Sequence, residues 1–315
     1  MNFWWRADPP LWSLALLPAG LGYRAGAALH RSLARRVRAK VPVISVGNLA
    51  VGGAGKTPVT LFLAKLLISR GRRPVVLSRG YGRLSRAARL VTADSSAHEV
   101  GDEPLLLARR GLTVVVGPHR AQLLDLAPDA DVALLDDGLQ HHALERDLDV
   151  IVADASNPLG NGCVLPRGPL REPLSELRRV KRGLLWLTRC DLPRDPRVQD
   201  LVDLGFPVVE SAFTASANLR GKRAFLFAGI ARPPSFEATV RALGAEIAGA
   251  RWFRDHHFFS PEDVALVRRE AQRAGADAIA TTEKDFVRLG ETAGIVPVPV
   301  DLTILRGASA LEQLP

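Results

Sequence analysis

The chain has 315 residues, of which 47% are hydrophobic and 24% are charged. This composition excludes a mostly disordered, collagenous or coiled-coil protein, and the length is near that of two domains. No apolar run reaches the roughly 18–20 residues of a membrane-spanning helix. Two cysteines, Cys163 and Cys190, cannot build a disulfide framework or a complete cysteine-based zinc site, so a reducing compartment is the simplest interpretation.

The net charge of +9 is concentrated near the N-terminus. Residues 1–40 hold seven basic residues and one acid, a local excess of +6, together with Trp4, Trp5 and Trp12. Nucleic acid is one partner of basic proteins, but basic residues beside tryptophan and a short apolar stretch indicate an anionic membrane surface instead. We therefore expect no nucleic-acid partner, and no obligate protein partner is evident.

Residues 1–38 are predicted to form a membrane-associating helical segment. The apolar run at 11–23 is interrupted by proline and glycine and is too short to span a bilayer. Apolar residues then recur at every fourth position from Leu29 to Val37, the spacing of an amphipathic helix. Two alternatives stay open: a helix packed on the protein's own core, and a signal peptide with a partly matching cleavage site at 25–27. Peripheral or shallow attachment is favoured.

From residue 41 onward the pattern is α/β. Apolar strand-like runs are predicted at 41–46, 74–77, 113–116, 131–135, 148–152 and 184–187, with helices at 59–69 and 119–127. Such continuous apolar strands alternating with helices indicate a parallel sheet with helices on both faces. A second α/β series has strands at 224–228, 246–253, 277–281 and 295–300 and helices at 234–243 and 261–273. We therefore predict a core at 39–215 and a smaller α/β domain at 216–315.

A glycine-rich run follows the first predicted strand and opens a predicted helix. It reads Val51-Gly52-Gly53-Ala54-Gly55-Lys56-Thr57-Pro58. Its glycines let backbone N–H groups close around phosphate oxygens, and the helix N-terminus adds partial positive charge. Lys56 would reach the β- and γ-phosphates and Thr57 would ligate Mg²⁺. Residue 50 is alanine where the strict pattern has glycine, so the run matches the GGxGKT variant and predicts a P-loop NTPase-like core.

An acidic pair supplies the second magnesium-side group that such a site needs. Four apolar residues lead into Asp136 and Asp137, which are followed by glycine. The alternative is a simple Asp-Gly turn. The pattern does not decide which of the two carboxylates faces the metal.

A kinase also needs a group that takes or orients the proton of the attacking hydroxyl. Asp102 and Glu103, just before a proline and a predicted helix, form one candidate. The run Asp255-His256-His257 in the second domain is another, and an Asp–His pair could share the proton. For each acid alone, a helix-capping or turn role is the plain alternative.

Taken together, the motifs resemble the tetraacyldisaccharide 4′-kinases, the lipid A 4′-kinases. They are, in order, SVGNLAVGGAGKTP, SRGYGR (78–83), VGDEP (100–104), DDGLQH (136–141), LPRGPLREP (165–173), FAGIARPPSF (227–236), DHH (255–257) and TTEKD (281–285). The resemblance implies a bacterial enzyme at the cytoplasmic face of the inner membrane, peripheral or monotopic. It implies transfer of the ATP γ-phosphate to the 4′-hydroxyl of a tetraacyldisaccharide 1-phosphate, a lipid A disaccharide precursor, giving lipid IVA.

The same resemblance implies roles for individual residues. Asp102 matches the family's base, and His256 matches the histidine that assists it. Lys56 would act in catalysis, with ATP on the loop residues 52–58 and Mg²⁺ on Thr57 and the acidic pair. Four further residues fall in motifs that look like substrate or nucleotide contacts: Arg79, Tyr81, Gln140 and Arg171. An active-site cleft between the two α/β domains would suit closure around ATP.

Two other classes of function compete with this interpretation. The first is a regulatory or metal-chaperone NTPase of the GGxGKT type; Thr188-Arg189-Cys190-Asp191 partly matches a guanine-reading TKxD element, with arginine in place of lysine. The second is a non-enzymatic membrane-binding protein with a vestigial loop. Lipid-dependent consumption of ATP distinguishes the kinase from both.

Overall fold

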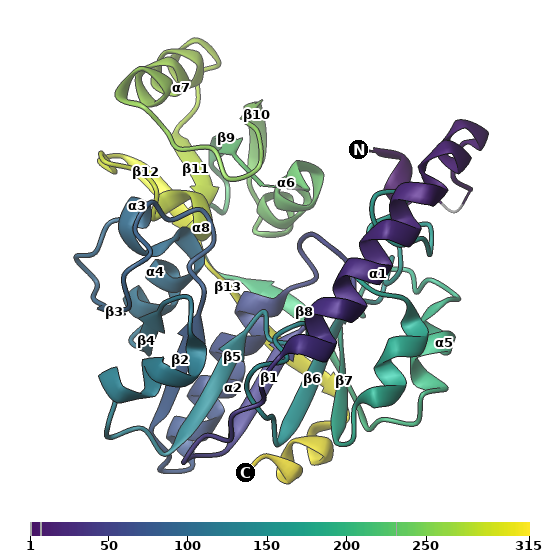
Figure 1. Ribbon diagram of the computed structural model, residues 1–315. Coiled ribbons are helices and arrows are strands. Elements are labelled where there is room, and N and C mark those ends of the chain that lie inside the picture. The colour runs from purple at the N-terminus through teal and green to yellow at the C-terminus, as the bar shows by residue number, and fades with distance from the viewer. Residues whose placement is uncertain (1, 7, 231) are drawn as a thin grey trace. The chain divides into compact units, whose positions relative to one another are not determined.

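The computed structural model describes residues 2–6, 8–230 and 232–315, and the chain forms two compact units (Figure 1). The first unit comprises residues 1–78, 119–213 and 302–315, and the second unit comprises 79–118 and 214–301. These units do not coincide with the predicted segments, because 79–118 belongs to the second unit and 302–315 to the first. The division into 1–38, 39–215 and 216–315 stays a prediction.

The first unit contains a largely parallel sheet with the strand order β13-β8-β7-β6-β1-β5-β2. The strands are β1 (Val43–Gly47), β2 (Pro74–Ser78), β5 (Val132–Asp136), β6 (Leu148–Asp154), β7 (Gly183–Thr188), β8 (Val208–Ala215) and β13 (Val300–Arg306). The central strand β1 pairs in parallel with both β5 and β6. Figure 1 shows these strands side by side, and the parallel sheet predicted from the apolar runs is confirmed.

Both faces of this sheet are buried, as predicted. On β7, Trp186 lies edge-on against Phe62 of α2, with 5.4 Å between the ring centroids. The neighbouring Leu185 belongs instead to an apolar cluster with Leu177 and Leu201. Because successive residues of a strand point to opposite faces, different helices cover the two sides. The helices are α2 (Lys56–Ser69), α5 (Val198–Val202) and the 3₁₀ helices η3 (Arg120–Leu126), η4 (Leu174–Arg179) and η5 (Ala308–Gln313).

The N-terminal segment is helical over less of its length than predicted. It consists of η1 (Asn2–Trp5), η2 (Leu11–Leu16) and α1 (Leu17–Leu33). The expectation that the helix continues to Val37 is wrong, because the backbone of Val37 pairs with another segment: its N–H donates to Ala143 and its carbonyl accepts from Glu145, both at 2.9 Å. Among the described residues, no helix combines the length and the hydropathy needed to cross a membrane.

The second unit contains a parallel sheet with the order β10-β9-β11-β12. Its strands are β9 (Arg223–Ala228), β10 (Glu246–Trp252), β11 (Ala278–Thr282) and β12 (Ile295–Val298), and β3 (Arg89–Val91) pairs antiparallel with β4 (Thr113–Val116). Its helices are α3 (Ala97–Val100), α4 (Asp102–Arg109), α6 (Pro233–Ala242), α7 (Pro261–Arg273) and α8 (Glu283–Phe286). The strand predicted at 295–300 ends at Val298, and β13 begins after Pro299. The series predicted from residue 224 is otherwise confirmed.

Candidate active site

The phosphate loop lies where the sequence predicts it, between the fully buried β1 and the first turn of α2. Gly52 and Gly55 have φ angles of 108° and 93°, which side-chain-bearing residues rarely adopt. A Cβ on Gly55 would also lie 2.8 Å from Cζ of Phe213. Lys56 is the first residue of α2, so the loop lies at the helix N-terminus, where the helix dipole supplies partial positive charge.

Two carbonyls of this loop accept hydrogen bonds from residues that the sequence analysis did not assign to the site. The hydroxyl of Thr188 donates to the carbonyl of Ala54 at 2.9 Å, and the guanidinium of Arg189 donates to that of Gly53 at 3.2 Å. Arg189 is fixed in turn by Asp154 at 2.8 Å. The segment noted for its partial match to a base-reading element therefore contacts the loop backbone directly.

The two carboxylates at the end of β5 have different surroundings. Asp136 lies opposite Val46 of β1 in the parallel register, is 2% exposed and accepts a hydrogen bond from Ser78. Asp137 has a φ of 51° and lies 3.5 Å from Nζ of Lys56. Asp137 is thus the carboxylate next to the loop lysine.

Asp137 is held as a charged group. Burial alone would raise the pKa of its carboxyl, but the charges of Lys56 and Arg171, together with the hydrogen bonds from Arg171, lower it to about 2. Nη1 of Arg171 lies 2.8 and 2.7 Å from the two carboxylate oxygens. A carboxylate that stays ionised beside Lys56 suits a hard cation such as Mg²⁺, which prefers oxygen ligands and often binds through only one or two carboxylates and phosphate oxygens.

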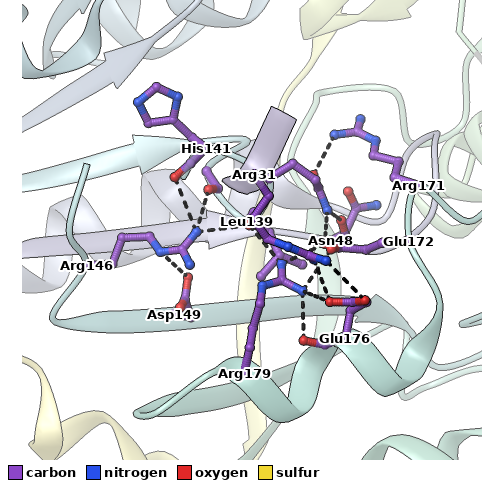
Figure 2. A network of polar contacts seen from close by, with 12 residues as sticks. Arg31, Asn48, Leu139, His141, Arg146, Asp149, Arg171, Glu172, Glu176 and Arg179 are labelled. Carbon is purple, nitrogen blue, oxygen red and sulfur yellow. Dashed lines mark hydrogen bonds and ion pairs between the residues drawn. The ribbon is translucent and has the colours of Figure 1, made fainter. Parts of the chain in front are cut away.

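Arg171 belongs to a network of polar contacts (Figure 2). Gln140 faces Arg171 with its carbonyl oxygen at 3.3 Å and donates to Glu172 at 2.8 Å. Glu172 is 7% exposed and pairs with Arg179, whose Nη1 lies 2.8 Å away. Beyond Arg179, Glu176 forms a 2.5 Å ion pair with Arg31 of α1. The predicted residues Gln140 and Arg171 therefore lie beside Asp137, as part of a chain of alternating charges that the sequence did not reveal.

The second unit brings together the predicted Asp102 and His256. Asp102 opens α4 and is 5% exposed, and its Oδ2 lies 3.0 Å from Nδ1 of His256. The other oxygen, Oδ1, accepts from the backbone N–H of Glu103 at 2.9 Å. His256 has a φ of 59° and its side chain is 32% exposed, so it is the more accessible member of the pair.

Two cations that the sequence analysis did not assign surround this pair. Nζ of Lys284 lies 2.8 Å from Glu103 and 3.8 Å from Oδ2 of Asp102, and Nη2 of Arg288 lies 3.2 Å from the same oxygen. Burial acts to raise the pKa of the Asp102 carboxyl, but His256, Lys284 and Arg288 together hold it well below its usual range. The carboxyl group of Asp102 is therefore ionised at neutral pH.

The remaining predicted residues of the second unit are less enclosed. Tyr81 is 72% exposed, and its ring meets that of His256 edge-on with 5.3 Å between centroids. Arg79 is exposed. His257, the second histidine of the DHH run, makes structural contacts instead: its Nε2 lies 2.8 Å from Oδ2 of Asp263, and its ring stacks on Phe253.

A family model described as tetraacyldisaccharide-1-P 4′-kinase matches residues 12–314. The chain belongs to this family. The tetraacyldisaccharide 4′-kinase of Anaeromyxobacter dehalogenans (strain 2CP-1 / ATCC BAA-258) is 47% identical over 352 residues, covering 98% of this chain and 92% of that protein. The enzyme of the same name from Methylobacterium sp. (strain 4-46) is 41% identical over 317 residues, covering 98% and 94%.

A solved structure supports the fold of this tetraacyldisaccharide-1-P 4′-kinase family member. The crystal structure of the "apo" form of LpxK from Aquifex aeolicus, in complex with ATP, superposes with a TM-score of 0.76 at 27% identity. The match covers 96% of this chain and 98% of that chain. The resemblance seen in the motifs is confirmed, and with it the P-loop NTPase-like architecture.

Proposed function

We propose that this kinase transfers the γ-phosphate of ATP to the 4′-hydroxyl of a tetraacyldisaccharide 1-phosphate, a lipid A precursor, to give lipid IVA. The observation that carries the proposal is the phosphate loop with Lys56 against Asp137, in a chain that belongs to the tetraacyldisaccharide-1-P 4′-kinase family. Membership of that family also disfavours a regulatory or metal-chaperone NTPase. Consumption of ATP should therefore require the disaccharide lipid; equal consumption without lipid would contradict the proposal.

On the nucleotide side, the phosphate loop at residues 52–58 binds the phosphates of ATP, through the backbone N–H groups that precede Pro58. Lys56 neutralises negative charge that develops on the phosphates during transfer. Its Nζ donates to Oδ1 of Asn48 at 3.0 Å, which holds the side chain at the start of α2. Thr57, Asp136 and Asp137 would hold Mg²⁺, which neutralises the β- and γ-phosphates when it is bound. A cation held by Asp137 would compete with Lys56 and Arg171 for its carboxylate, and both side chains would then be available to phosphate oxygens.

On the acceptor side, Asp102 and His256 together take the proton of the 4′-hydroxyl. Because the pKa of Asp102 is depressed and its side chain is buried, the carboxylate alone is a weak and poorly accessible base. His256 is exposed enough to meet the hydroxyl, and the charge of Asp102 stabilises the proton on its ring. Arg79, Tyr81, Gln140 and Arg171 are proposed contacts of the substrates.

The lipid substrate is reached at an anionic membrane surface, at the cytoplasmic face of the inner membrane. No residue of α1 is buried, and the apolar side chains of the N-terminal segment remain largely exposed. The docking face consists of Leu11, Trp12, Leu14, Leu17, Leu21, Leu29 and Leu33. Acyl chains leave a bilayer only at about 0.8 kcal/mol per CH₂, so an enzyme that docks by such a face spares its substrate that cost.

Two basic residues near the N-terminus are paired with acids of the protein itself. Arg31 is engaged by Glu176, and Arg38 lies 3.4 Å from Glu145. Arg24, Arg35 and Arg36 are exposed. Each basic residue near an anionic surface contributes about 1 kcal/mol, so these three would supply the electrostatic part of docking.

A further inference from the structure

The start of the chain is fastened to a distant stretch of the first unit. The carbonyl of Trp4 accepts from the backbone N–H of Asn161 at 2.7 Å, and its indole N–H donates to the carbonyl of Pro166 at 3.0 Å. The side-chain amide of Asn157 donates to the carbonyl of Trp5 at 3.2 Å. Both tryptophans are half-buried, so they are anchored in the protein and are not available for insertion into a membrane.

The indole of Trp5 reaches the phosphate loop. Its Cζ2 and Cη2 atoms lie 3.4 and 3.7 Å from the position that a Cβ of Gly52 would occupy. The same ring packs on the buried cluster that contains Leu49, Leu159 and Leu170. Trp5 therefore fills the space beside Gly52, whose φ is 108°.

The stretch that anchors the N-terminal residues also anchors the loop. The backbone N–H of Val51 donates to the carbonyl of Pro169 at 2.8 Å, and that of Arg171 donates to the carbonyl of Leu49 at 2.7 Å. Residues 157–171 thus contact the two tryptophans as well as the start of the phosphate loop. The same stretch of chain therefore holds both the N-terminal residues and the phosphate loop in place.

We propose that Trp5 is a positioning residue for the phosphate loop, so that residues 3–6 form a structural part of the nucleotide site. Glycine has more backbone freedom than any other residue, and a ring packed on Gly52 removes conformations into which the loop would otherwise relax. Loop residues already held in place lose less entropy when phosphate binds. The inference rests on the proposed binding of ATP at this loop. By reciprocity, nucleotide must stabilise the docked N-terminal residues by the same factor.

The test compares Trp5→Ala with a tryptophan variant outside this segment. Binding of a fluorescent ATP analogue is titrated without lipid, so that membrane docking does not enter the measurement. Trp5→Ala should bind the analogue about three- to tenfold more weakly than wild type, the range expected for one aromatic contact. Trp252→Ala should bind it as wild type does, because Trp252 is 38% exposed and lies on β10 of the second unit, outside residues 3–6 and outside the loop. Equal affinity of wild type and Trp5→Ala would overturn the inference.

A second measurement on the wild-type chain covers the case in which Trp5→Ala fails to fold. Saturating ATP should slow hydrogen exchange at the amide of Asn161, which is bonded to Trp4, by about the same three- to tenfold. Unchanged exchange in a protein that demonstrably binds ATP would overturn the inference and leave the proposed function standing. A wild-type chain that binds no ATP analogue at all would instead refute the proposed function.

Discussion

Replacement of Asp102 by asparagine tests the acceptor side of the site with little change of shape. The substitution removes the negative charge from a side chain that is 5% exposed and lies within 3.8 Å of His256, Lys284 and Arg288. The amide cannot stabilise a proton on His256 as a carboxylate does. We therefore expect a loss of turnover that is separable from any loss of stability.

The size of both effects follows from the contacts. Breaking a buried ion pair by removing one partner costs about 3–5 kcal/mol. In the variant, Arg288 still pairs with Asp285 at 3.3 Å and Lys284 still pairs with Glu103 at 2.8 Å, which reduces the loss of stability. We expect the free energy of unfolding to fall by about 1–3 kcal/mol, the range for one lost partner of a buried polar group. Loss of a general base lowers turnover by about 10²–10⁴-fold.

The assay measures kcat and the KM for ATP at saturating lipid, with a thermal melt of each variant. Asp102→Asn should lower kcat by at least about 100-fold and leave the KM for ATP within about twofold, because the pair of Asp102 and His256 acts on the hydroxyl and not on the nucleotide. His256→Ala should lose at least as much, because its ring is the group that meets the hydroxyl, and the double variant should lose less than the product of the two factors. A folded Asp102→Asn variant with kcat within about threefold of wild type, or multiplicative losses in the double variant, would refute the reasoning.

Three further outcomes are expected. Gly55→Ala should lower the melting temperature, since its Cβ would meet Phe213 at 2.8 Å at a φ of 93°, whereas Gly53→Ala, with nothing within 4 Å of its Cβ, should melt as wild type; equal melts would contradict this. Burial and the nearby charges of Arg179 and Arg146 lower the pKa of His142 to about 4, so the unfolded chain binds the extra proton first as pH falls below about 6.5. Stability should therefore fall between about pH 6.5 and pH 4, and less so in His142→Gln, as pH-dependent melts would reveal. Binding to vesicles, measured by sedimentation, should weaken and lose its salt dependence when the three exposed arginines are changed to glutamine. It should weaken at every salt concentration when the exposed leucines of α1 are changed to serine. Variants that bind vesicles as wild type does would refute the docking face. The arginines are Arg24, Arg35 and Arg36, and the leucines are Leu21, Leu29 and Leu33.

The nucleotide half of the site could be predicted because its signals are local. A short apolar run, a cluster of glycines and a lysine at a helix start predict β1, the loop and α2 without reference to the rest of the chain. The acidic end of β5 is visible for the same reason. That Asp137 faces Lys56 while Asp136 faces Ser78 depends on the φ of 51° at Asp137, which no residue pattern specifies.

The parts that were missed depend on contacts between remote residues. The first three tryptophans were interpreted together as membrane anchors, but Trp4 and Trp5 bind residues about 150 positions away, and Trp12 alone of the three is exposed. Likewise, Lys284 and Arg288 have no local pattern that places them beside Asp102. The strand β8 is absent from the strands predicted from the sequence, because its residues have only a weak local preference and packing against β7 stabilises it.

The central claim is that the phosphate loop delivers the γ-phosphate of ATP to the lipid. It is tested most directly by incubating wild type and Lys56→Ala with γ-labelled ATP and a tetraacyldisaccharide 1-phosphate and locating the label. The account predicts that wild type places the label on the 4′-oxygen of the lipid, and that folded Lys56→Ala loses most of this transfer, because the developing phosphate charge loses its positioned cation. Near-wild-type labelling by Lys56→Ala, or label released only as inorganic phosphate by wild type, would contradict it.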